Sequence, residues 1–111
     1  MAKHEFAIMR ETPNNERYDS YEPQNYSSLI SIDDDYIEIL IPSFEGILCY
    51  CHTRLIETNN LVYCGITLIP PESAKLFVVV FEGNNMGQYD ALIDLFKQAI
   101  KQEKYIIHYG L

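Results

Sequence analysis

Apolar and polar positions alternate along several short stretches of the chain, which is the pattern of half-buried β-strands. Residues 4–9 predict a first strand, and residues 29–32 and 36–41 predict two further strand pieces. The acidic run Asp33–Asp35 between these pieces predicts a turn. Residues 11–28 contain two prolines and many Asn, Ser and acidic residues without a clear period, so we expect a loop there.

The central segment predicts a β-hairpin. Residues 47–55 and 61–69 are rich in apolar residues, and the pair Asn59–Asn60 between them tolerates the positive φ of a tight turn. In a hairpin with this even-length loop, odd-numbered residues of the first strand share a face with even-numbered residues of the second. The apolar face would then contain Ile47, Cys49, Cys51, Thr53 and Leu55 beside Val62, Cys64, Ile66 and Leu68. The opposite, mixed face would contain Leu48, Tyr50, His52 and Arg54 beside Tyr63, Gly65, Thr67 and Ile69.

Helical spacing dominates the last third of the chain. Apolar residues recur every three or four positions over residues 86–104, which predicts an amphipathic helix. Residues 71–82 start with a Pro-Glu-Ser sequence typical of a helix start, so we expect a helix ending at Gly83. The apolar run within them also suits a buried strand over 75–81, which is the alternative. Residues 105–111 predict a final strand.

These elements predict an α+β fold. With 111 residues, the chain has the size of one domain, covering residues 1–111. We expect an antiparallel sheet of four to six strands built around the central hairpin, with one or two helices packed on one face.

The composition indicates a globular protein of the cytoplasm. Hydrophobic residues make up 48% and charged residues 22% of the chain, which is typical of a globular protein. The sequence has no run of about 18 apolar residues and no signal-peptide pattern, so we expect neither a membrane span nor export. The odd number of cysteines, three, favours free thiols in the cytoplasm.

The candidate metal and thiol sites have simpler interpretations. Cys49 and Cys51 would lie on one face of a strand while His52 points to the other, so these residues and Cys64 suit a hydrophobic core better than a zinc site. Asp33–Asp35 lacks the spacers and the glycine of a calcium loop and suits a solvated turn. We therefore expect no catalytic residue, no metal and no cofactor.

Charge is distributed unevenly. The net charge is −8, of which residues 1–45 carry −7. Tyrosines interleave with these acids, and such a surface favours binding of a basic protein, because tyrosine supplies rigid contact area and acids steer the partner. The candidate binding residues are Tyr18, Asp19, Tyr21, Glu22, Asp33, Asp34, Asp35, Tyr36 and Glu38. The alternative is that the tyrosines pack beside the core and the acids only keep the protein soluble.

Two functions fit these features. The first is a non-enzymatic protein that binds a basic protein partner, as an immunity protein neutralises a nuclease toxin. Nucleic acid is disfavoured as a ligand because a phosphate backbone requires Lys and Arg. The second is a small enzyme or ligand-binding domain with a pocket on the mixed hairpin face, using Tyr50, His52 or Tyr63. The sequence does not indicate the oligomeric state.

Overall fold

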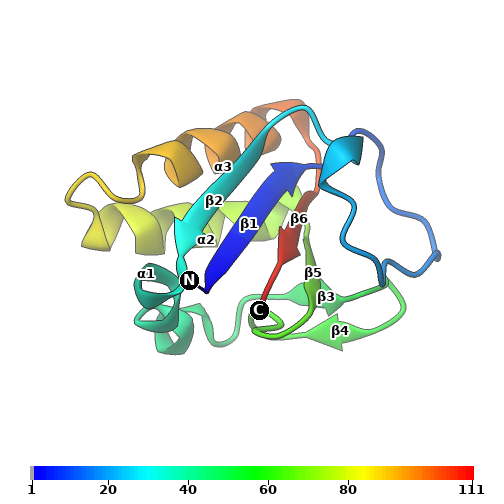
Figure 1. Cartoon of the computed structure of the whole chain (residues 1–111), viewed down its shortest axis with the longest axis horizontal. Coiled ribbons are helices and arrows are strands. Elements are labelled where there is room, and N and C mark those ends of the chain that lie inside the picture. Colours follow the sequence, from blue (N-terminus) through cyan, green and yellow to red (C-terminus); the bar gives the residue numbers. More distant parts are fainter. Residues whose placement is uncertain (1) are drawn as a thin grey trace.

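The computed structural model describes residues 2–111 and contains one six-stranded sheet in the order β2-β1-β6-β5-β3-β4 (Figure 1). Every neighbouring pair of strands is antiparallel. The strands are β1 Lys3–Ile8, β2 Leu29–Asp33, β3 Cys49–Cys51, β4 Glu57–Thr58, β5 Ile66–Ile69 and β6 Ile106–Tyr109. The helices are α1 Asp34–Glu38, α2 Pro71–Asn84 and α3 Asp90–Gln102, with short 3-10 turns at Pro23–Asn25 and Ile41–Phe44. The predicted α+β class with an antiparallel sheet is confirmed.

Helices α2 and α3 pack against each other and cover one face of the sheet (Figure 1). Residues 71–82 are helical, as expected from the proline in the first turn of α2, and the alternative strand over 75–81 is not formed. The predicted helix within 86–104 and the final strand within 105–111 are also confirmed, as α3 and β6.

The core beneath these helices is aromatic. All five phenylalanines of the chain are fully buried, and they come from β1, α2, α3 and the 3-10 turn at Ile41–Phe44. The ring centroids of Phe6 and Phe96 are 5.7 Å apart, and those of Phe81 and Phe96 are 5.2 Å apart at an edge-to-face angle of 90°. These contacts join the N-terminal strand to both long helices.

The opposite face of the sheet is covered by the loop between β1 and β2. Tyr18 and Tyr26 from this loop pack against a second apolar cluster that includes Leu68 and Ile107. The backbone N–H of Tyr18 donates to the carbonyl of His52 at 2.8 Å, which fixes the loop to the end of β3. The prediction of a loop over 11–28 is confirmed, apart from the single turn at Pro23–Asn25.

The predicted strand over 36–41 is wrong, because α1 begins immediately after β2. The Asp33 carboxylate caps this helix by accepting from the N–H of Asp35 at 2.9 Å, and acids in the first turn suit the helix dipole. Ile37 is fully buried whereas Ile39 is 71% exposed, so the apparent alternation does not correspond to burial. The buried positions are instead spaced three and four residues apart, at Ile37, Leu40 and Phe44.

The predicted hairpin register is also wrong. Strand β3 ends at Cys51 because His52 adopts a left-handed conformation with φ 62°, and the chain turns back immediately to form β4 on one side of β3. Strand β5 then pairs on the other side, with Tyr50 opposite Leu68 and Cys51 opposite Thr67. In this register, odd-numbered residues of β3 share a face with odd-numbered residues of β5. The register differs by one position from the predicted one, and a shift of one position moves every side chain of a strand to the other face.

The three cysteines consequently do not lie together on a buried face. Cys49 is buried, Cys51 is partly exposed and Cys64 is exposed in the loop before β5, and all three are free thiols. Burial raises the pKa of the Cys49 thiol to about 12, so this group stays protonated at neutral pH. The expectation of a buried residue is therefore correct for Cys49 and wrong for Cys64.

Candidate functional site

Acidic side chains gather at the end of the sheet where β1 begins and where β2 and β6 end. Glu5 of β1 lies opposite Tyr109 of β6, and the start of β1 lies beside α1 (Figure 1). Helix α1 continues directly from β2 on the face that carries α2 and α3. We call the exposed residues Asp35, Tyr36, Glu38 and Ile39, together with the partly buried Asp33 and Asp34, the α1 surface.

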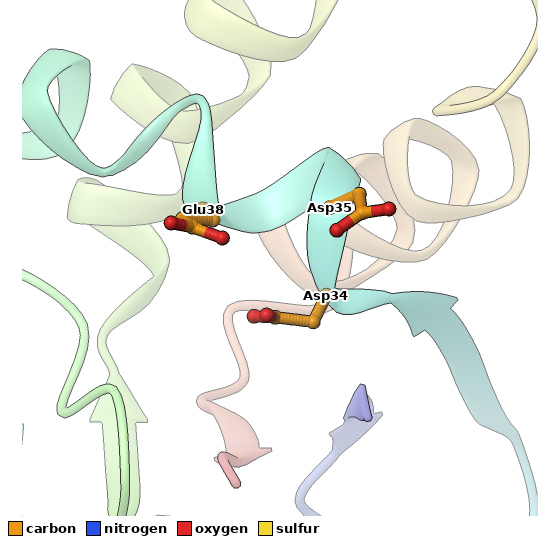
Figure 2. Close-up of side chains that lie close together, drawn as sticks. All are labelled: Asp34, Asp35 and Glu38. Carbon is orange, nitrogen blue, oxygen red and sulfur yellow. The ribbon is translucent and has the colours of Figure 1, made fainter. Parts of the chain in front are cut away.

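Three carboxylates converge on α1. One oxygen each of Asp34, Asp35 and Glu38 lies within 4.8 Å of the others, and Figure 2 shows the three side chains projecting from the helix. Asp35 and Glu38 are exposed, and within residues 2–111 neither forms an ion pair with a basic side chain. Asp35 and Glu38 therefore repel each other and Asp34 without a basic partner of their own.

These three oxygens are also the atoms that could contact a metal ion. Calcium takes six to eight oxygen ligands and magnesium takes six, so water or a partner would have to supply every ligand beyond these three. Exposed acidic groups of this kind are common without any ion.

A chain of hydrogen bonds leads from Asp34 into the interior of the protein. Its Oδ1 lies 2.8 Å from Nε2 of His4 and also accepts from the hydroxyl of Tyr63. Nδ1 of His4 lies 2.9 Å from Nε2 of His108, and Nδ1 of His108 lies 2.9 Å from the hydroxyl of Thr67. The side chains of both histidines are fully buried, and their rings stack with centroids 5.1 Å apart.

The carboxylate fixes the direction of this chain. Because an ionised Asp34 can only accept, Nε2 of His4 must carry the hydrogen. The hydroxyl of Thr67 accepts from the N–H of Val62 at 2.8 Å and donates to Nδ1 of His108, so Nε2–H of the neutral His108 donates to Nδ1 of His4. Every ring nitrogen is satisfied in this arrangement, and every hydrogen points toward Asp34.

The charges follow from these contacts. The hydrogen bond from Tyr63, and to a smaller extent the one from His4, holds the pKa of Asp34 below its usual value. The bond between Tyr63 and Asp34 also raises the pKa of Tyr63. Burial, with a smaller effect of His4, holds the pKa of His108 well below 6.5. At neutral pH the site therefore presents an ionised Asp34 above a neutral His108.

The other predicted binding residues lie on the opposite face of the sheet. Arg17 donates to both oxygens of Asp19 at 2.8 and 2.9 Å, and Nδ1 of His52 lies 3.0 Å from the same carboxylate. The Glu22 carboxylate accepts from the Asn25 amide at 2.7 Å. The structure thus divides the predicted residues into two groups, with Asp33, Asp34, Asp35, Tyr36 and Glu38 around α1 and Tyr18, Asp19, Tyr21 and Glu22 in the loop.

The residues of the alternative pocket have separate partners. The Tyr50 ring lies 6.5 Å from that of Tyr105 and faces the loop side of the sheet. Nδ1 of His52 lies 2.8 Å from the carbonyl of Tyr18, and its Nε2 accepts from the N–H of Ile66 at 3.3 Å. Tyr63 is bonded to Asp34. The shared hairpin face expected for these three residues is not formed.

Comparisons with protein-family models, with curated proteins and with solved structures find no significant match. Among the helices of residues 2–111, none combines the length and the apolar character needed to cross a bilayer.

Proposed function

We propose that the protein binds a basic protein partner through the α1 surface. The observation that carries this proposal is the group of three carboxylate oxygens within 4.8 Å of one another, of which those of Asp35 and Glu38 have no basic neighbour among the described residues. A lysine or arginine from a partner would relieve their mutual repulsion on binding.

Apolar contact area lies beside these charges. Tyr36 on α1 is 45% exposed, and Ile39, the C-cap residue of this helix, is 71% exposed. The Tyr36 carbonyl accepts from the hydroxyl of Tyr89 at 2.6 Å, and the bond from His4 orients Asp34, so the surface is held rigid before a partner arrives. A preorganised surface with aromatic and charged groups side by side is typical of protein interfaces.

The mechanism we propose is blockage. A nuclease toxin exposes a basic surface for its phosphate substrate, and an immunity protein with this acidic surface would occupy it. The net charge of −8 would speed the encounter at low salt and would repel nucleic acid. We place this activity in the cytoplasm, where three free thiols stay reduced.

The experiment is affinity capture from the native host with a charge-reversed bait. Asp35→Lys combined with Glu38→Lys changes the α1 surface but leaves the capping residue Asp33 and the histidine-bonded Asp34 in place. The matched control is Glu57→Lys combined with Asp94→Lys, which makes the same change of net charge at exposed sites on β4 and α3. Mass spectrometry then identifies the captured protein.

We expect the wild type and the control to capture a basic protein, and the α1 variant to lose it. Capture should also weaken as ionic strength rises, because exposed charges are screened beyond about 10 Å at 0.1 M salt. Equal capture by the α1 variant at physiological salt would show that the α1 surface is not the binding site.

A further inference from the structure

A hollow of about 620 Å³ opens at the acidic end of the sheet, on the face opposite α1. Its floor is part of one row of cross-strand neighbours, in which Glu5 lies opposite Tyr109 and Tyr109 opposite Ile66. Asp19 and Tyr21 from the loop between β1 and β2 form one wall. The hollow is therefore built by three strands and by the loop that covers them.

Glu5 is a buried acid with little compensation. The residue is only 7% exposed, yet it lines the hollow. Its Oε2 accepts from the hydroxyl of Ser31 at 3.2 Å, and the nearest ammonium, that of Lys3, is 3.9 Å away on a side chain that is 57% exposed. A carboxylate removed from water in this way is stabilised further by a cation that donates hydrogen bonds to it.

Two tyrosine rings lie next to this carboxylate. Tyr21 and Tyr109 meet edge to face with centroids 5.0 Å apart, and both line the hollow. Hydrogen bonding to Glu5 raises the pKa of the Tyr21 hydroxyl. Aromatic faces beside an acid are the surroundings that bind ammonium and guanidinium groups through cation–π and charge-assisted hydrogen bonds.

We propose that this hollow is an anchoring site for a lysine or arginine side chain of a basic protein partner, with Glu5 as the charge that receives it and Tyr21 and Tyr109 as its walls. This inference rests on the proposed function for its choice of a protein as the source of the cation. Lys3 holds a position near Glu5 that the incoming cation would take over, so it acts as a weak internal competitor.

The experiment is a titration of the purified protein with capped lysine, Nα-acetyl-lysine amide, followed by the backbone amide signals in nuclear magnetic resonance spectra. Signals of Glu5, Ile66 and Tyr109 should shift, with a dissociation constant on the order of 1 mM for a ligand of this size. Nα-acetyl-norleucine amide has the same stem without the charge, and it should leave those signals in place.

Variants test the named residues. Glu5→Gln should weaken binding of capped lysine by about tenfold, whereas Glu57→Gln on exposed β4 should leave it unchanged. Lys3→Gln should tighten binding, because the competitor is removed. Tyr21 is 55% exposed and can be replaced without opening the core, so Tyr21→Leu should weaken binding.

Equal shifts with the norleucine derivative, or unchanged binding by both Glu5→Gln and Tyr21→Leu, would overturn the anchoring site. Tighter binding of free 1,5-diaminopentane than of capped lysine would also overturn it, by assigning the hollow to a small amine. With the Asp35→Lys and Glu38→Lys bait, capped lysine should shift the signals of Glu5, Ile66 and Tyr109 as it does in wild type. Its capture result therefore tests only the proposed function, and the titration tests only the anchoring site.

Discussion

Asp34 accepts hydrogen bonds from Tyr63 and His4, so its side chain has less freedom than those of Asp35 and Glu38 on the same helix. His4 in turn depends on His108, which is fully buried and bonded to Thr67. The orientation of one surface acid is thus determined by residues from β1, β5, β6 and the loop before β5. Substitutions of these buried residues should disturb the α1 surface without removing any of its charges.

The buried imidazole of His108 should make stability depend on pH. Its pKa in the folded protein is well below 6.5, whereas in the unfolded chain the ring titrates near 6.5. The unfolded chain therefore binds more protons as the pH falls below about 6.5, and the free energy of unfolding falls with it. The contribution of the neutral His108 ring to stability is fully present above that pH. Below it, the contribution falls by at most about 1.4 kcal/mol per pH unit, because one proton is involved.

Urea denaturation at about pH 7 and about pH 5 measures this effect. His108→Gln should lower the stability at pH 7, because the bonds to His4 and Thr67 are disturbed, but it should lose less stability between the two pH values than wild type. The lowered pKa of Asp34 does not interfere, since its contribution is lost only as the pH falls below 3.8. The same loss of stability in both proteins would contradict the assignment to His108.

Some helices and strands can be predicted from the residues of their own segment, and others cannot. The periodicity of α3 and the proline at the start of α2 lie within each segment, so sequence alone predicts both helices. Helix α1 has only five residues, too few for its helical spacing to be distinguished from alternation. The end of β3 depends on His52, whose ring is held by Tyr18 and Ile66 from two other segments, so no local pattern could have located it.

The candidate site divides in the same way. The acids of α1 could be predicted from charge alone, because exposed carboxylates need no particular neighbour. The bond between His4 and His108 joins residues 104 positions apart. Finding it required the register of β1 against β6, which depends on pairing across the whole chain.

The structure of α1 can be tested by two isoleucine substitutions. Ile37→Ala removes a fully buried side chain and should lower the free energy of unfolding by about 2–5 kcal/mol. Ile39→Ala removes a side chain that is 71% exposed and should change it by less than about 0.5 kcal/mol. In a strand over 36–41 the two residues would share a face, and urea denaturation would then show similar losses for both.

The molecule as a whole carries a large negative charge with few compensating contacts. Glu38 lies at the end of α1, where the helix dipole disfavours a negative charge, and it is near the acids of the first turn. Keeping an unfavourable charge at a binding surface is a common compromise between stability and function.

We therefore expect Glu38→Lys to raise the free energy of unfolding by a few tenths of a kcal/mol at low salt. The gain should shrink in about 1 M salt, where the screening length is about 3 Å. The same variant should capture less of the basic partner. A variant that is both less stable and fully able to bind would contradict the role assigned to this residue.

Strands β1 and β6 are antiparallel neighbours, so Ala2 and Gly110 leave the sheet at the same end, beside Glu5. A purification tag or fluorescent fusion added at residue 2 or at residue 111 would emerge next to the lysine-anchoring hollow, and a polyhistidine sequence could place its own cations there. Labels for interaction work are better attached at Gln102, which is exposed at the end of α3 shortly before β6 begins, at the opposite end of that strand from Tyr109.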